Sequence, residues 1–144
     1  MKHAVKQLSI FLENKPGELG FLTKTLSQGG VSIKSIILAD SSDFGLARII
    51  VDNPEKAKAL LESHGLSVRF TDVFGVRIND VIGSFDRVVS LLSQKGVNIL
   101  YCYSFYEDKS GIFIFSVPSD QFSIATQTMV ENGVEIVEAQ HFYN

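Results

Sequence analysis

The chain opens with alternating apolar and polar residues and then changes to a helical spacing. The alternation over Lys6–Glu13 predicts a strand, and leucines three and four residues apart over Glu18–Gln28 predict a helix. Gly29 and Gly30 follow directly, which is typical of a helix end. The other elements predicted for the first half are strands at Val31–Ala39, Phe44–Val51 and Leu66–Thr71, a turn at residues 40–43, and a helix from Pro54 to Gly65 capped by Asp52 or Asn53.

The first half of the sequence is repeated in the second half. A shift of 66 positions places residues 8–36 on residues 74–102 without a gap, and two added residues in the last helix bring Gly65 onto Gly133. The identical pairs are Gly17/Gly83, Leu26/Leu92, Ser27/Ser93, Gln28/Gln94, Gly30/Gly96, Val31/Val97 and Ile33/Ile99. We interpret this as the duplication of a unit of about 70 residues.

The second half therefore has the same predicted order of elements as the first. They are strands at Val73–Ile78, Val97–Tyr106, Ile112–Val117 and Val134–Gln140, helices at Ser84–Gln94 and Gln121–Asn132 (capped by Ser119 or Asp120), and a turn at Glu107–Gly111. Each half reads β-α-β-β-α-β. This order predicts an α+β fold of two ferredoxin-like sandwiches, each an antiparallel four-stranded sheet with two helices on one face. The predicted domains are residues 1–71 and 72–144, joined almost without a linker and therefore packed together.

The sheet faces away from the helices contain more apolar residues than an isolated sandwich should expose. Contiguous exposed apolar surface usually marks an interface, so we expect the other repeat, another copy of the chain, or both to cover these faces. By simple alternation, the residues on them are Phe11, Ile36, Leu38, Leu46 and Ile50 in the first half, and Leu100, Cys102, Ile112 and Ile114 in the second.

The turn between the first strand and the first helix suits a small anion. Pro16 would fix φ in the first helical turn, where its missing N–H is not needed. Gly17 has no Cβ, so a ligand can approach the backbone there. The free N–H groups of the first turn then favour a carboxylate. The alternative is an ordinary strand-to-helix turn without a ligand.

Charge and composition exclude several classes of partner. The net charge is −3, with 13 Lys and Arg against 16 Asp and Glu. The chain also has no basic run, which argues against nucleic acid and against an anionic membrane surface. No segment reaches transmembrane length, and Lys6 interrupts any apolar stretch that could serve as a signal peptide. The single cysteine, Cys102, allows no internal disulfide and fits a reducing cytoplasm.

No catalytic or metal-binding constellation emerges from the sequence. Cys102 lies within a predicted strand with no histidine placed to activate it, so we interpret it as a packing residue. His3, His64 and His141 are scattered and share no metal-ligand spacing. An acylphosphatase-like hydrolase on this scaffold would need an arginine in the anion loop, and neither loop has one. We predict a binding protein without enzymatic activity, metal or cofactor.

The duplicated order of elements, together with Asn14-x-Pro16-Gly17-x-Leu19 after the first strand, resembles the ACT domain, a small regulatory module of amino-acid metabolism. The segments 29–33 and 95–99 are similar to that family's start of the second strand. The resemblance covers the whole chain. The second copy departs from it, because Asp80-Val81-Ile82-Gly83 lacks the proline.

The resemblance implies that units pair side by side and bind a free amino acid at the seam, where the turn of one unit faces the start of the second strand of its partner. Carried over, Asn14 to Leu19 would face Asn98, and Asp80 to Phe85 would face Ser32. The residues implied for ligand binding are Asn14, Lys15, Pro16, Gly17, Glu18, Leu19, Ser32, Asp80, Ile82, Gly83, Ser84, Phe85 and Asn98. A seam is also required physically. A helix terminus contributes about 0.3–1 kcal/mol to anion binding at a surface, whereas a millimolar ligand needs about 4 kcal/mol.

Roles for these residues follow as hypotheses. Backbone N–H groups near Gly17 and Glu18 would hold the ligand carboxylate, and the side chains of Asn14, Ser32 or Asn98 would accept from its ammonium. Leu19, Phe85 and the stem of Lys15 would line the side-chain pocket. Asp80 would pair with an ammonium, or alternatively serve only as a helix cap or a solvated turn residue.

The sequence thus predicts a cytoplasmic regulatory protein that senses a free amino acid. We expect it to form a homo-oligomer, namely a dimer, and to transmit ligand binding through its oligomeric state or to a biosynthetic enzyme. The alternative is an interaction module that docks on such an enzyme without binding a ligand. The missing proline of the second copy favours that alternative slightly.

Overall fold

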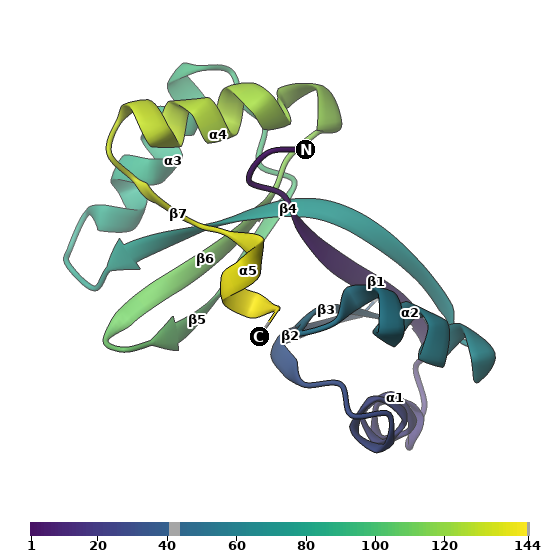
Figure 1. Cartoon of the computed structure of the whole chain (residues 1–144). Helices are drawn as coiled ribbons and strands as arrows, with labels where there is room; N and C mark the ends of the chain where they lie inside the picture. The colour runs from purple at the N-terminus through teal and green to yellow at the C-terminus, as the bar shows by residue number, and fades with distance from the viewer. Residues whose placement is uncertain (41–43, 144) are drawn as a thin grey trace. The chain divides into compact units, whose positions relative to one another are not determined.

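The computed structural model describes residues 1–40 and 44–143, so most of the predicted turn at residues 40–43 lies outside the described residues (Figure 1). The chain separates into two compact units. The first unit contains Lys6–Thr71 and the C-terminal segment from Gln140. The second unit contains Asp72–Ala139 and Met1–Val5. Each terminal segment is therefore grouped with the repeat from which it is distant in sequence.

The elements follow the predicted order in both repeats. Those of the first repeat are β1 (Val5–Glu13), α1 (Glu18–Gln28), β2 (Ile33–Asp40), β3 (Phe44–Val51), α2 (Pro54–Ser63) and β4 (Ser67–Asn79), which continues into the second repeat. Those that follow are α3 (Ser84–Gln94), β5 (Tyr101–Glu107), β6 (Ser110–Ser116), the 3-10 turn η1 (Ser119–Gln121), α4 (Phe122–Glu131), β7 (Glu135–Val137) and α5 (Ala139–Phe142).

Strand pairing gives each unit the ferredoxin-like arrangement. The order of hydrogen-bonded neighbours is β2-β3-β1-β4 in the first unit and β7-β4-β6-β5 in the second. The pairs β1–β3, β2–β3, β4–β6, β4–β7 and β5–β6 are all antiparallel. The predicted α+β fold of two ferredoxin-like units is confirmed.

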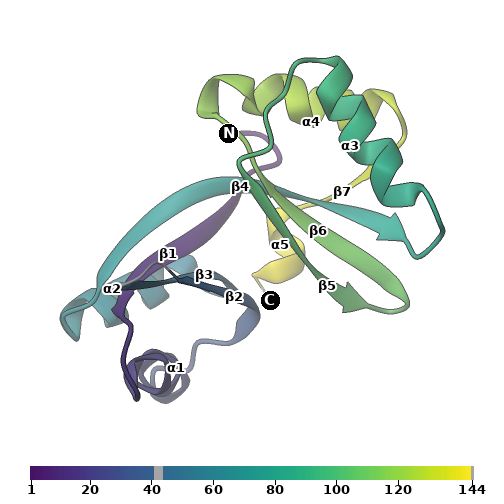
Figure 2. The ribbon, with the colours of Figure 1, turned by 180° about the vertical axis from the view of Figure 1, so that it is seen from behind.

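One face of each sheet is covered by its two helices, as Figures 1 and 2 show for α3 and α4. The apolar core of the first unit lies between helices and sheet and includes Leu8, Ile10, Leu12, Leu22, Leu26, Ala47, Ile49, Ala57 and Leu61. That of the second unit includes Phe74, Val76, Ile78, Val88, Leu92, Phe115, Phe122, Ala125 and Met129. The corresponding positions in the two lists reflect the duplication.

Several predicted strands have other bounds than those observed. The strand predicted at Val97–Tyr106 begins only at Tyr101, as β5. The strands predicted at Leu66–Thr71 and Val73–Ile78 are one uninterrupted strand, β4, because polar residues such as Thr71 and Asp72 can occupy a strand without ending it. The last predicted strand, Val134–Gln140, was also wrong at its end. Only Glu135–Val137 pairs with β4, and the chain then forms the short helix α5.

The predicted face of β2 was wrong, because the register of β2 against β3 shifts between Ile33 and Ser35. An irregularity of this kind moves all following side chains to the opposite face. Ile36 therefore pairs with the core residue Ile49, and Leu38 pairs with Ala47, so both lie on the helix side of the sheet, where they remain exposed at its edge.

The face predicted for Cys102 in the second unit was also wrong, because residues 97–100 lie outside β5 and alternation from Val97 does not extend to Cys102. Ile99 packs against the core, and Cys102 pairs with the core residue Phe115, so Cys102 also lies on the helix side of the sheet. The assignment to the other face was correct for Ile112 and Ile114, which are buried there. Leu100, just before β5, is exposed.

Candidate functional site

The two predicted turns have the same backbone geometry. Gly17 caps α1 with φ +91°, and Gly83 caps α3 with φ +88°. Both values lie in the left-handed region, which glycine adopts without steric cost. Matching hydrogen bonds complete the turns: the Phe21 N–H donates to Gly17 O and the Arg87 N–H to Gly83 O, both at 2.9 Å. Glycine is therefore required by the conformation itself as well as by access to the backbone.

The position of Pro16 differs from the prediction. Helix α1 begins at Glu18, so Pro16 lies before the cap and outside the first helical turn. The Glu18 N–H donates to Lys15 O at 3.4 Å. The next N–H groups, those of Leu19 and Gly20, have no carbonyl acceptor inside the helix because they belong to its first turn. These two groups, rather than those of Gly17 and Glu18, are the donors best suited to an anion.

Charged side chains close over the first turn in a way that the sequence analysis missed. Lys15 Nζ lies 3.0 Å from Glu13 Oε2 and 3.7 Å from Glu18 Oε1. The hydrogen bond that Lys15 donates to Glu13 and the negative charges of Glu13 and Glu18 raise the pKa of Lys15 above its ordinary value. The ammonium of Lys15 is thus held between two carboxylates at the rim of the turn, in addition to the predicted contribution of its stem. The spacing of these charges, at residues 13, 15 and 18, was the available signal.

The second turn has the same backbone but different chemistry. At the shift of 66, Asn79, Val81 and Ser84 replace Glu13, Lys15 and Glu18, so the second turn has no equivalent of this ion pair. Val81 is 66% exposed, and Ile82 is completely exposed. Asp80 is exposed as well. The second turn presents an apolar tip where the first presents a lysine and a proline.

The predicted side-chain pocket residues occupy equivalent positions beside their turns. Leu19 and Phe85 are the second residues of α1 and α3, and each is 38% exposed. The ring of Phe85 packs against that of Phe113 on β6, with 4.9 Å between ring centroids. Phe85 is therefore a fixed apolar wall with one accessible side.

Ser32 and Asn98 have anchored backbones and exposed side chains. The Ser32 N–H donates to Asp52 Oδ1 at 2.9 Å, and the Asn98 N–H donates to Gln121 Oε1 at 2.7 Å. Both residues are exposed. Their hydroxyl and carboxamide groups suit the predicted role of accepting from an ammonium.

A unit cannot combine its own turn with its own Ser32 or Asn98. In the first unit, Glu13 at the turn pairs with Phe44, whereas Ile33, next to Ser32, pairs with Val51 at the other end of β3. Seven strand steps of about 3.3 Å separate these ends by roughly 23 Å. Any site that uses both groups needs a second unit.

A cleft lies beside each turn at equivalent positions. The first cleft has a volume of about 440 Å³ and is lined by Phe11, Glu13, Glu18, Phe21, His64, Gly65, Leu66 and Ser67. The second cleft has a volume of about 300 Å³ and is lined by Arg77, Ile78, Asn79, Ser84, Arg87, Val88, Gly133, Val134 and Glu135. Most of these residues correspond through the repeat, and both volumes suit a small molecule. Of the predicted site residues, Glu18 lines the first cleft and Ser84 the second.

The two clefts differ in charge because arginines of the second replace phenylalanines of the first. Arg77 corresponds to Phe11, and Arg87 to Phe21. Arg77 Nε donates to Glu135 Oε2 at 2.9 Å, and Arg87 donates to Asn132 O at 2.7 Å, so both guanidinium groups have partners within the second unit. The second cleft is therefore lined by two guanidinium groups and the carboxylate of Glu135, whereas the first is lined by the carboxylates of Glu13 and Glu18.

Other chemically reactive groups form no constellation in the described part of the chain. No three His, Cys, Asp or Glu side chains among the described residues gather as they would around a metal ion. His64 Nδ1 lies 2.9 Å from Leu60 O at the end of α2. Cys102 lies at the surface of the second unit. Its thiol is partly screened from water, and this partial burial raises the pKa of the thiol. No helix in residues 1–40 and 44–143 is long and apolar enough to span a membrane.

Comparison with known proteins agrees with this geometry. The solved structure of protein BT0572 from Bacteroides thetaiotaomicron is similar over 99% of this chain and 97% of its own, with 32% identity and a TM-score of 0.93. The regulatory subunit of aspartate kinase from Thermus thermophilus, solved in its ligand-free form, has the same fold at 17% identity, covering 89% of this chain and 93% of its own with a TM-score of 0.65. That from Thermus flavus is similar at 18% identity, covering 88% and 92% with a TM-score of 0.60. No curated protein matches the chain. Residues 3–144 match the family described as ACT domain pair, and this protein belongs to that family.

Proposed function

We propose that this protein is a non-catalytic cytoplasmic sensor of a free amino acid in amino-acid metabolism. The observation that carries the proposal is the duplicated turn, in which Gly17 and Gly83 adopt the same left-handed conformation at the start of an exposed helix. Membership of the ACT domain pair family supports it. So does the fold shared with regulatory subunits of aspartate kinase.

The ligand carboxylate would lie over the first turn of α1 and accept from the N–H groups of Leu19 and Gly20. An added Cβ at Gly20 would meet no atom within 4 Å, so the space over this part of the helix is open. The equivalent position in α3 is Asp86, an acidic residue of the first helical turn. Its carboxylate competes with an anionic ligand for the same donors, whereas Glu18, the acidic residue in the first turn of α1, lies 3.7 Å from the ammonium of Lys15. The first turn is therefore the preferred carboxylate site.

The ligand ammonium would face a second unit, either of the same chain or of a second copy. Asn98 supplies a carboxamide oxygen from an anchored strand start and would close over the first turn, with the Asn14 side chain from the other wall. Ser32 would serve the second turn in the same way. This enclosure meets the energetic requirement, because one helix terminus alone contributes at most about 2 kcal/mol when partly buried.

Occupancy would then be transmitted by favouring one arrangement of the paired units over another. A ligand shifts such an equilibrium only as far as its affinities for the two states differ. A ligand that contacts both walls of a seam meets this condition, because separation of the walls removes half of its contacts.

The test is a thermal-unfolding screen of the purified protein against each of the twenty amino acids at 10 mM. A ligand at about 100 times its Kd stabilises the native state by about 2.7 kcal/mol, which raises the Tm by roughly 5–10 °C for a chain of this size. The variant Gly20→Leu should abolish the shift, since its side chain covers the donors. A leucine in place of glycine within a helix also favours folding, so loss of binding cannot be attributed to unfolding.

The matched control is Asp86→Leu, the same new side chain at the equivalent position of α3. It should leave the response to the amino acid unchanged if the first turn is the site. A response that survives Gly20→Leu and disappears in Asp86→Leu would move the site to the second unit. No response to any of the twenty amino acids would refute the proposal.

A second candidate function is docking on a biosynthetic enzyme without ligand binding, and the second turn favours it. Val81 and Ile82 present an exposed apolar tip. The only charged group that this tip offers to the ammonium of a zwitterion is the carboxylate of Asp80. Exposed apolar groups of this kind usually contact another protein. If this function holds, Ile82→Ser will prevent co-purification of an enzyme, and the Tm will not respond to amino acids.

A further inference from the structure

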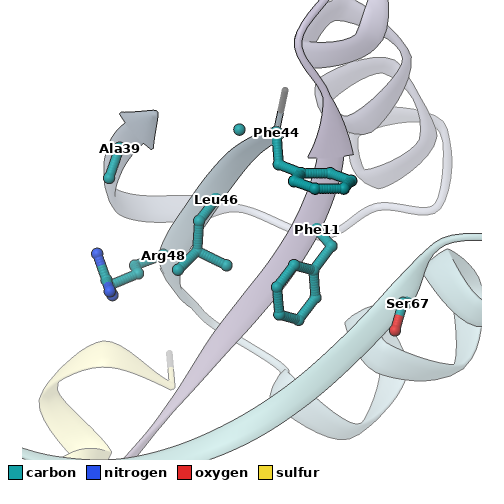
Figure 3. Close-up of a pocket in the computed structure, with 7 residues that line it drawn as sticks. Phe11, Ala39, Phe44, Leu46, Arg48 and Ser67 are labelled. Carbon is teal, nitrogen blue, oxygen red and sulfur yellow. The ribbon is translucent and has the colours of Figure 1, made fainter. Parts of the chain in front are cut away.

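The sheet face of the first unit that points away from α1 and α2 is apolar and open. Phe11 is 47% exposed and Phe44 is 56% exposed, and Leu46 lies half-buried between them. Figure 3 shows these three side chains projecting from β1 and β3 toward the same space. With Ala39, Gly45, Arg48 and Ser67 they line a hollow of about 660 Å³, which we call the open sheet face.

The second unit has no such opening at the corresponding positions. Ile112 corresponds to Leu46 and Ile114 to Arg48, and both isoleucines are buried. Ser110, which corresponds to Phe44, is also buried and accepts from Arg77 Nη1 at 2.9 Å. The open sheet face is therefore particular to the first unit, although the two units share their backbone plan.

The order of residues along the strands makes the open sheet face complementary to itself. Three successive rows of paired residues form it: Glu13 with Phe44, Phe11 with Leu46, and Ser9 with Arg48. Alternate residues of a strand are about 6.6 Å apart, so the acidic row and the basic row lie at equal distances on either side of the central apolar row. A two-fold axis along the central row would exchange the outer rows.

From this arrangement we infer that the open sheet face is an interface with a second copy of the same chain, packed face to face about a two-fold axis along the Phe11–Leu46 row. Phe11 then meets Phe11 of the second copy, and Leu46 meets Leu46. The guanidinium of Arg48 lies over the ring of Phe44 of the second copy and within reach of its Glu13. By symmetry the contacts of Arg48 with Phe44 and Glu13 occur twice, whereas the Phe11 and Leu46 self-contacts on the axis occur once.

The charges permit this contact without disrupting the turn. Lys15 contacts Oε2 of Glu13, so Oε1 remains as an acceptor for a guanidinium. Arginine also stacks favourably on an aromatic ring, which suits the Arg48–Phe44 row. A partner of either uniform charge would place one like charge against Glu13 or Arg48, whereas a second copy opposes both with the correct sign.

The size of the face sets the expected strength of the dimer. A phenylalanine can bury about 150–250 Å², so the exposed halves of Phe11 and Phe44 offer roughly 100 Å² each. With Leu46, Ala39 and the stem of Arg48, each copy offers roughly 300–400 Å². The total of roughly 600–800 Å² is below the 1,200 Å² or more of stable complexes. We therefore expect a dimer that half-dissociates at roughly 10–300 µM.

Sedimentation velocity of the full chain from about 1 to 500 µM tests the interface. The wild type should change from monomer to dimer, and Phe11→Ser should weaken association more than about tenfold because the interface loses an apolar side chain from each copy. Ile124→Ser is the control, since Ile124 is 38% exposed but lies on α4 of the second unit and is not part of the open sheet face. It should change the dimer affinity by less than about twofold. A wild-type chain that remains monomeric throughout this range would overturn the inference.

Charge exchange tests the two-fold arrangement itself. Arg48→Glu and Glu13→Arg should each weaken the dimer, because each places like charges together at two sites. The double variant should recover the dimer, and an equimolar mixture of the single variants should recover it in part. Failure of the double variant to recover, in a protein with native circular dichroism, would overturn the arrangement, as would dimerisation that is insensitive to all of these substitutions.

Discussion

Replacement of glycine by alanine should have opposite effects at two positions three residues apart in the first turn. At Gly17 the backbone has φ +91°, and an alanine forced into the left-handed region costs about 1–2 kcal/mol. Alanine also restricts the unfolded chain more than glycine does, and this offsets about 0.4–1 kcal/mol of the cost. Because an added Cβ meets no atom within 4 Å, no steric term contributes. The net loss is therefore between about 0 and 1.6 kcal/mol, with a middle value of about 0.8 kcal/mol.

At Gly20 the same substitution should stabilise. This residue lies within α1, and its added Cβ also meets nothing within 4 Å. Alanine is favoured over glycine in a helix by up to about 1 kcal/mol. The comparison isolates backbone conformation, since the chemical change and the open surroundings are the same at both positions. Gly83→Ala, at φ +88°, should behave like Gly17→Ala.

Thermal unfolding followed by far-ultraviolet circular dichroism measures the difference. For a unit of 60–100 residues, 1 kcal/mol corresponds to a change in Tm of about 4–8 °C. We expect Gly17→Ala to lower the Tm by several degrees and Gly20→Ala to raise it or leave it unchanged. If both variants change the Tm in the same direction, the left-handed cap at Gly17 does not govern the effect and the reasoning is refuted.

Three further predictions concern packing and titration. A Cβ at Gly29 would lie 2.2 Å from Leu60 Cδ1, the end of a half-buried side chain that can change its rotamer, so Gly29→Ala should destabilise by only about 0.5–1.5 kcal/mol in urea unfolding. A loss above about 3 kcal/mol would show that Leu60 cannot move aside. The raised pKa of Lys15 means that its contact with Glu13 stabilises the fold below the ordinary lysine pKa and is lost as the pH rises through the pKa of the folded state. Glu13→Gln should therefore lower the pKa of Lys15 in an NMR titration. An unchanged pKa would exclude Glu13 as the main cause of the shift. The raised pKa of Cys102 predicts slower alkylation by iodoacetamide at pH 8 than for a cysteine in an unfolded peptide; an equal or faster rate would contradict it.

Element positions could be predicted well because the pattern of apolar residues is strong and occurs twice. The predicted helix Glu18–Gln28 and strand Phe44–Val51 have the observed bounds. The face of β2 could not be predicted, because a register shift such as that at Ile33 changes no residue type. Alternation assigns side chains to faces only while the strand is regular. In the second unit, residues 97–100 lie before β5, so alternation counted from Val97 assigns Cys102 to the wrong face.

The turn at Gly17 was predicted from the sequence, whereas the contacts of its side chains were not. The turn at Gly17 was recognisable because glycine commonly marks the turn between a strand and a helix. Its left-handed φ and the contacts of Lys15 depend on three-dimensional geometry. Glu13 and Glu18 approach one ammonium only because the turn folds back between them. The equivalence of the two clefts likewise appears only when residues near 13, 20 and 66 are brought together.

The duplication preserved the backbone and changed the chemistry, and this difference limits what the two turns can do. Both have a left-handed glycine, an exposed helix start and an adjacent cleft. The first turn adds a lysine held by two carboxylates and leaves Gly20 open. The second adds Asp86 in the first helical turn and an apolar tip at Ile82. Two sites with equal backbones but such different surroundings should not bind the same ligand with equal affinity. The first turn is better suited to an amino acid and the second to a protein surface, which would place sensing and response in separate copies of one fold.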